Sequence, residues 1–149
     1  MSILEENLMK KNNIILSLII LAVLTRLLPH PPNVAPITGI ALFAGNKFDN
    51  KWIGLILPII CMLISDLFLG FSSITLFVYL AFILISYIGM TSKINNTTIL
   101  KSSTLFFFIT NFGVWLLGYP LTIQGFITCY TLALPFFVNT IIGDLLHIV

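Results

Sequence analysis

Charged side chains are scarce in this sequence. Asp, Glu, Lys and Arg make up 8% of the 149 residues, whereas an ordinary soluble domain carries roughly 25%. Hydrophobic residues account for 58% and the mean hydropathy is +1.10, which excludes a soluble monomer. The net charge of +2 comes from a few separated lysines and not from a basic patch, so we expect no nucleic-acid partner. We interpret residues 1–149 as a single integral membrane domain.

The sequence also lacks the motifs that would indicate an enzyme or a metal site. Its two cysteines, Cys61 and Cys129, lie inside apolar runs without CxxC or Cys/His spacing, so we expect them to be packing residues. No GxxxxGK loop occurs, so the chain is not expected to use ATP itself. An aspartyl protease motif of the GxGD type would need glycine where Ile141 stands, ahead of Gly143 and Asp144. We therefore expect no catalytic activity, no cofactor and no metal.

Long apolar runs predict an all-α membrane protein with six transmembrane segments. A spanning helix needs roughly 20 apolar residues, which leaves room for five or six spans here. A first helix is predicted over 14–28, after a cytoplasmic segment 1–13, and Pro29, Pro31 and Pro32 should end it. The next apolar run, 34–45, is too short to cross fully, so we expect a short or re-entrant segment. The remaining segments are expected over 52–70, 74–90, 103–118 and 123–148, with a kink at Pro135.

The lysines predict the orientation of these segments. Lys10 and Lys11 precede the first segment, Lys47 and Lys51 separate the second from the third, and the last two separate the fourth from the fifth, at Lys93 and Lys101. The alternate loops contain neither lysine nor arginine. Because lysine and arginine favour the cytoplasmic side, we expect both termini in the cytoplasm.

Polar side chains are predicted to gather near the opposite, outer side of the membrane. An ionisable group inside a span is costly and usually faces a cavity, a partner or another charge. We predict an outward-facing pocket for a small organic molecule, lined by Arg26, His30, Asn33, Asp66, Asn111, Trp115 and Tyr119. The stiff proline loop that carries His30 and Asn33 is expected to close over Arg26 as a lid or wall.

Structural interpretations of the same residues remain open. Arg26 and Asp66 can form an ion pair that only fixes helix packing, while Trp115 and Tyr119 can belong to an interfacial aromatic belt. His30 can cap its own loop.

Three further polar residues lie in the last segment. Asp144 and His147 are candidates for docking a partner subunit or, structurally, for pairing with a lysine such as Lys93. Asn139 follows Pro135 by four residues and can satisfy carbonyls freed by the kink. A weak internal sequence similarity relates Pro58 and Asp66 to Pro135 and Asp144. The aspartates follow their prolines by eight and nine residues respectively.

Several short motifs resemble those of a known family. The resemblance covers residues 26–146 and is most specific in the proline motif Arg26-Leu27-Leu28-Pro29-His30-Pro31-Pro32-Asn33. It continues through Pro36, Ala41-Leu42-Phe43, Ser65-Asp66, Phe77-Val78-Tyr79, Thr110-Asn111-Phe112-Gly113-Val114-Trp115, Cys129-Tyr130, Pro135-Phe136-Phe137, Asn139-Thr140 and Gly143-Asp144. These motifs resemble a family of small bacterial membrane proteins of uncharacterised function described as transport proteins. That family is distantly similar to the S components, the substrate-binding subunits of energy-coupling-factor vitamin transporters.

The resemblance implies an S-component-like bundle of six helices. Its outer side would bind a molecule of vitamin or cofactor-precursor size, and its inner side would dock on a transmembrane coupling subunit driven by ATPases. Membrane lipid would surround the bundle, which the resemblance implies to lie in the inner (plasma) membrane of a bacterium. The alternative hypothesis is a non-transporting accessory or assembly subunit of a larger membrane complex. A binding protein needs the outer polar cluster to be hollow, whereas an assembly subunit needs it filled.

Overall fold

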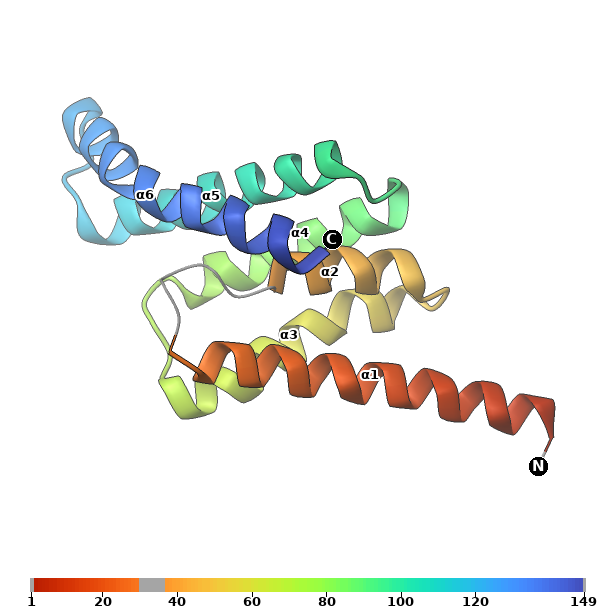
Figure 1. Cartoon of the computed structure of the whole chain (residues 1–149). Helices are drawn as coiled ribbons and strands as arrows, with labels where there is room; N and C mark the ends of the chain where they lie inside the picture. Colours follow the sequence, from red (N-terminus) through yellow and green to blue (C-terminus); the bar gives the residue numbers. More distant parts are fainter. Residues whose placement is uncertain (1, 30–36, 149) are drawn as a thin grey trace.

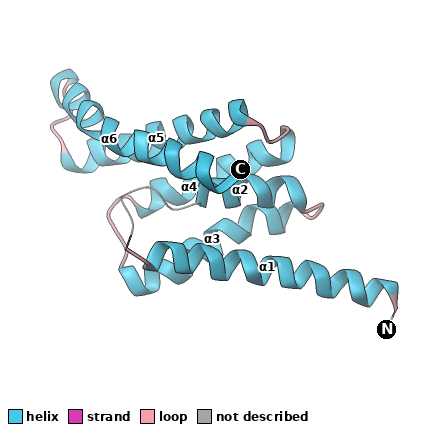
Figure 2. Cartoon of the chain, viewed as in Figure 1, coloured by secondary structure: helices cyan, strands magenta, loops and turns pink. Residues whose placement is uncertain are grey.

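The computed structural model describes residues 2–29 and 37–148, apart from the side chains of residues 147 and 148. Within these residues the chain is all-helical and contains no strand (Figure 2). The helices are α1 (Ile3–Leu27), α2 (Ile37–Lys47), α3 (Lys51–Leu69), α4 (Thr75–Thr91), α5 (Asn96–Gly118) and α6 (Ile123–Ile148). The predicted all-α class is therefore confirmed.

Helix length separates the helices that can cross a bilayer from those that cannot. Four of the described helices, α1, α3, α5 and α6, are long and apolar enough to span a membrane, and α4 is a shorter apolar helix of 17 residues. The 11 residues of α2 measure only about 16 Å along the helix axis, roughly half of the hydrocarbon core. The second segment is thus short, as predicted, and α2 does not cross the bilayer by itself.

Successive helices run in alternating directions (Figure 1). The connections from α2 to α3 and from α4 to α5 lie at the end of the bundle toward which the N-terminus points, while those from α3 to α4 and from α5 to α6 lie at the other end. Lys47, Lys51 and Lys93 lie in or directly beside the first set of connections, and Lys101 lies in the second turn of α5. Lys10 and Lys11 lie in the N-terminal half of α1 and line one pocket together with Lys47. All six lysines therefore share one end of the molecule, here called the lysine end, and the opposite end is called the lysine-free end.

The short helix α2 forms the centre of the bundle. Nearly all of its residues from Ile37 to Gly45 are buried, against α4 on one side and α3 on the other. Glycine permits the close approach of α2 and α4, since a Cβ on Gly45 would collide with the carbonyl oxygen of Ser86, and one on Gly89 with that of Leu42. Small residues at crossing points are typical of helix packing in membranes, where backbones must approach closely.

Two helices begin earlier than predicted. The predicted start of the first helix at residue 14 was wrong, because Ser2 caps α1 through a reciprocal capping box with Glu5 and the helix begins at Ile3. Glu6 and Lys10 add an ion pair of 2.7 Å one turn later. Helix α5 begins at Asn96 rather than 103, because the side chain of Asn95 accepts a hydrogen bond from the Thr98 amide.

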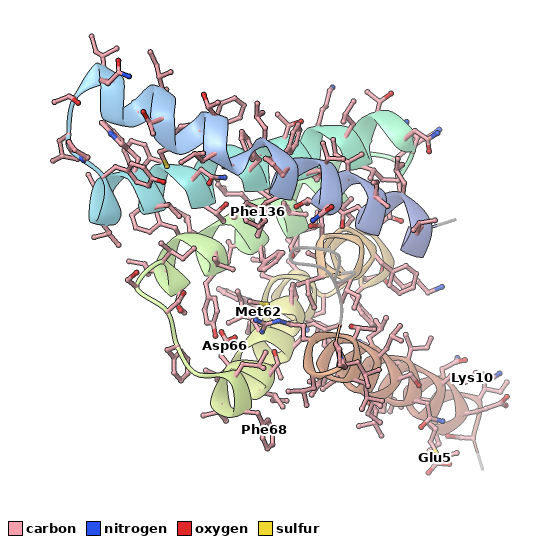
Figure 3. All side chains as sticks on the ribbon, turned by 60° about the vertical axis from the view of Figure 1, so that its left-hand side comes forward. Glu5, Lys10, Met62, Asp66, Phe68 and Phe136 are labelled. Atoms are coloured by element: carbon pink, nitrogen blue, oxygen red, sulfur yellow. The ribbon has the colours of Figure 1, made fainter. Side chains whose placement is uncertain are left out.

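Helix α1 lies at the edge of the bundle. It packs on α3 and, more sparingly, on α2, and Ala22 is its one buried residue among those described (Figure 1). Its polar first turns, which include Glu5 and Lys10, extend away from the bundle at the lysine end (Figure 3). The other end of α1 therefore places its last turn, which carries Arg26, against the last turns of α3.

Candidate functional site

An ion pair between Arg26 and Asp66 joins α1 to α3 at the lysine-free end. Both helices run toward this end, so the last turn of one meets the last turns of the other. The guanidinium Nη1 of Arg26 lies 2.8 Å from Oδ1 of Asp66, and the side chains are 19% and 7% exposed respectively. The same nitrogen also donates to the hydroxyl of Ser65 and to the carbonyl oxygen of Met62. The structural ion pair that the sequence left open is therefore present.

A third helix completes the coordination of this carboxylate. The hydroxyl of Tyr79 on α4 donates to Oδ2 of Asp66 at 2.8 Å, so each carboxylate oxygen has its own donor. Neither Tyr79 nor Ser65 was among the predicted site residues. A signal existed for Tyr79, because a tyrosine within an apolar run needs a partner for its hydroxyl. The partner itself could not be found, since it depends on how α3 packs against α4.

A cavity of about 280 Å³ borders this ion pair. Its wall combines the charged pair with hydroxyl groups and a few apolar side chains. The lining residues are Arg26, Ile37, Thr38, Met62, Asp66, Gly70, Ser72, Thr75, Val78, Phe82, Phe106 and Thr140. We call this space the polar cavity. Pockets of about 300–1,000 Å³ with a few placed polar groups are typical of small-molecule sites, and the polar cavity lies at the lower edge of that range.

A second cavity of about 340 Å³ adjoins the first. Its wall is mainly apolar and is formed by Ile74, Val78, Phe106, Thr110, Asn111, Val114, Tyr119, Cys129, Leu132, Ala133 and Phe136. We call this space the apolar cavity. Val78 and Phe106 line both cavities, which are thus neighbours across these two side chains. Figure 3 shows Met62 and Asp66 on α3 facing the part of α6 that carries Phe136.

The structure divides the predicted pocket between the two cavities. Arg26 and Asp66 line the polar cavity, whereas Asn111 and Tyr119 line the apolar one. The amide of Asn111 donates to the carbonyl oxygen of Phe107, one turn earlier on its own helix. The sequence predicted one pocket that all of these groups would face. In the structure they are divided between two neighbouring cavities.

Trp115 lies apart from both cavity walls. Its indole nitrogen donates to the carbonyl oxygen of Pro120 at 3.1 Å, and its ring contacts those of Phe112 and Phe126. This bond ties the end of α5 to the turn that follows it. His30 and Asn33, and with them the predicted lid, fall outside the described residues, as does the side chain of His147.

Asp144 is the second buried carboxylate of the chain. It is 1% exposed on α6, and Oδ2 accepts a hydrogen bond of 2.7 Å from the hydroxyl of Ser103 on α5. The carboxylate thus has a hydroxyl donor within the bundle, and Lys93, the lysine suggested by the sequence, is exposed. The docking role of Asp144 stays a prediction. Asn139 is half-buried and bonds no described carbonyl, whereas Thr140 donates to the carbonyl oxygen of Phe136 one turn back.

The site chemistry is polar but not metal-binding within the described part of the chain. No group of three His, Cys, Asp or Glu side chains there lies close enough to hold a metal ion. Neither a curated protein nor a solved structure matches this sequence. A family model does match, over residues 6–149, and its description is a family of unknown function, DUF6580. The match covers nearly the whole chain, which therefore belongs to this family.

Proposed function

We propose that this protein is the substrate-binding membrane subunit of a small-molecule transporter. In this proposal it binds an organic molecule of vitamin or cofactor-precursor size from the lysine-free end and has no catalytic turnover of its own. Transport is energised by other subunits, a transmembrane coupling protein and its ATPases. The S-component-like arrangement and the inner membrane of a bacterium as its location belong to the same proposal.

One observation carries this proposal: a cavity with a charged pair and several hydroxyl groups in its wall lies inside a bundle that is otherwise strongly apolar. Polar groups within a membrane protein are expensive to keep and usually serve a ligand, a pathway or each other. Arg26 and Asp66 satisfy each other in part, but the hydroxyl-rich wall beside them leaves space of ligand size.

The accessory-subunit hypothesis is favoured by a different observation. Both oxygens of Asp66 have protein donors, and the side chains of Asn111 and Trp115 bond to nearby backbone carbonyls. These groups are therefore satisfied without a ligand. Under this alternative the polar network fixes helix packing, and the outer surface of the bundle binds other membrane proteins.

Native mass spectrometry of the protein purified in mild detergent separates the two functions. We expect an added mass that denaturation releases as a small organic molecule. A spectrum that shows a stoichiometric partner protein and no small molecule, in repeated preparations, would establish the accessory role instead.

The orientation is tested by cysteine labelling in intact cells. Ser72 precedes α4 at the lysine-free end, and Ser92 follows α4 at the lysine end. A membrane-impermeant maleimide should label Ser72→Cys and not Ser92→Cys. The reverse pattern, or labelling of both variants, would contradict binding from outside the cell.

A further inference from the structure

We propose that the molecule bound is an acid with an apolar body. Its oxyanion lies in the polar cavity against Arg26, and its hydrocarbon or aromatic part extends past Val78 and Phe106 into the apolar cavity. This inference rests on the proposed function and adds the chemical class of the ligand.

Two nitrogens of the Arg26 guanidinium indicate the charge of the head group. All hydrogen bonds that Arg26 makes to described residues leave from Nη1, so Nη2 and Nε donate to none of them. Asp66 accepts from Nη1 of Arg26 through Oδ1 and from the hydroxyl of Tyr79 through Oδ2, so no described bond joins it to Nη2 or Nε. Nη2 and Nε of a guanidinium at a cavity wall, with no acceptor among the described residues, match a carboxylate or another oxyanion, which accepts two parallel hydrogen bonds.

Hydroxyl groups can complete the recognition of the oxyanion. Thr38, Ser72 and Thr75 line the same cavity as Arg26. Hydroxyl donors strengthen the binding of an anion that has left water, because hydrogen bonds to charged groups are about twice as strong as neutral ones. Met62 and Phe82 add an apolar part to the same wall.

The apolar cavity provides room for the rest of the molecule. The two cavities share Val78 and Phe106, and successive turns of α6 line first one and then the other, from Ala133 and Phe136 to Thr140. Phe106 packs against Phe82 with ring centroids 5.1 Å apart. A ligand that reaches from one cavity into the other therefore passes beside the ring of Phe106, and its apolar part meets an apolar wall.

A photoreactive probe series tests this chemistry directly. The probes are a medium-chain carboxylic acid with a diazirine near its far end, the matching alcohol and the matching amine, each added to the protein in lipid nanodiscs. After irradiation, mass spectrometry locates the labelled peptide. We expect the acid to label the α6 segment 129–136 about tenfold more than the alcohol or the amine, as the loss of a hydrogen-bonded charge implies.

Matched variants assign the label to the two cavities. The double variant Arg26→Gln with Asp66→Asn keeps hydrogen-bonding groups but removes both charges, and should lower labelling by the acid to the level of the alcohol. Ala133→Phe fills the apolar cavity and should reduce labelling at 129–136 severalfold. Leu134→Phe is the control, because Leu134 is exposed on the adjoining face of α6. The comparison of probes on the wild-type protein requires no variant to fold.

The possible outcomes test the proposed ligand class separately from the proposed function. Equal labelling by all three probes, or labelling confined to the exposed face of α6, would overturn the inference. A retained native molecule that is a cation, or is polar throughout, would also overturn it but would leave the proposed function standing. Absence of any retained molecule, together with a partner protein, would remove the proposed function as well.

Discussion

Asp66 and Asp144 are two buried carboxylates placed toward opposite ends of the same bundle. Each follows a proline within its own helix, Pro58 in α3 and Pro135 in α6, and each lies near the end of that helix. Asp66 meets an arginine from α1 and a tyrosine from α4, and a cavity lies beside it. Asp144 is the more deeply buried of the two and accepts a bond from a serine of the neighbouring helix.

This contrast teaches that burial alone does not mark a binding site. A carboxylate bonded by a serine hydroxyl between two packed helices holds these helices in register, as α5 and α6 require. A carboxylate paired with a guanidinium, next to a cavity, can serve packing and a ligand at once. The decisive difference is the cavity beside Asp66, together with the two nitrogens of Arg26 that donate to no described residue.

The largest expected effect on stability comes from removing one charge of the Arg26–Asp66 ion pair. Arg26→Leu leaves Asp66 as an uncompensated buried charge, which should lower the free energy of unfolding by about 3–5 kcal/mol. The double variant Arg26→Leu with Asp66→Leu should recover most of this loss. Equilibrium unfolding in detergent micelles measures both. A double variant as unstable as the single one would show that the pair itself, and not the orphaned charge, stabilises the bundle.

Removal of the tyrosine donor should have the next largest effect. Tyr79→Phe takes one hydrogen bond from the Asp66 carboxylate and should lower stability by about 1.5–3 kcal/mol, because the acceptor is charged. Tyr87→Phe, on the same helix but 59% exposed, is the matched control and should be neutral. Equal effects at the two positions would contradict a specific role of Tyr79.

Two adjacent serines of α5 test the role of the hydrogen bond to Asp144. Ser103→Ala removes the donor to Asp144 and should lower stability by about 1–3 kcal/mol. Ser102 is equally buried, but its hydroxyl has no hydrogen-bond partner among the described residues. Ser102→Ala should therefore be neutral or slightly stabilising, since it removes a buried unsatisfied group. The measurement is thermal unfolding of the two variants side by side. Equal losses of stability would contradict a specific role of Ser103 as the donor to Asp144.

The smallest effects are expected at the polar residues of α5. Asn111→Leu and Trp115→Leu should each cost less than about 1 kcal/mol, because hydrogen bonds within membrane helices average roughly 0.6 kcal/mol and leucine suits the bilayer. Under the proposed function Asn111→Leu, which alters the wall of the apolar cavity, should still weaken retention of the small molecule. Trp115→Leu should weaken it less. Unfolding of either variant would show that its side chain is structural.

The helices were largely predictable from the sequence, and the contacts between them were not. Pro29 and Gly70 stand just beyond the ends of α1 and α3, so these ends could be predicted within a residue. The start of α1 was missed although Ser2 and Glu5 have the spacing of a capping box.

The side-chain contacts of the candidate site were even less predictable from the sequence than the packing of the helices. Helical spacing correctly places Asn111 and Trp115 one turn apart, but it cannot tell that each side chain bonds a nearby backbone carbonyl instead of facing one pocket. The ion pair between Arg26 and Asp66 was one interpretation that the opposite charges of the two residues allowed. The contribution of Tyr79 depended on the packing of α3 against α4, which no local pattern encodes.

The central claim is that the carboxylate at the lysine-free end belongs to a ligand site and the other does not. The most direct test is native mass spectrometry of two matched double variants, Arg26→Gln with Asp66→Asn and Ser103→Ala with Asp144→Asn. Each pair removes the charges or donors of one site and leaves the other intact. The account predicts that the retained small molecule is lost from the first variant and kept by the second. Loss from both variants alike, or from neither, would contradict it.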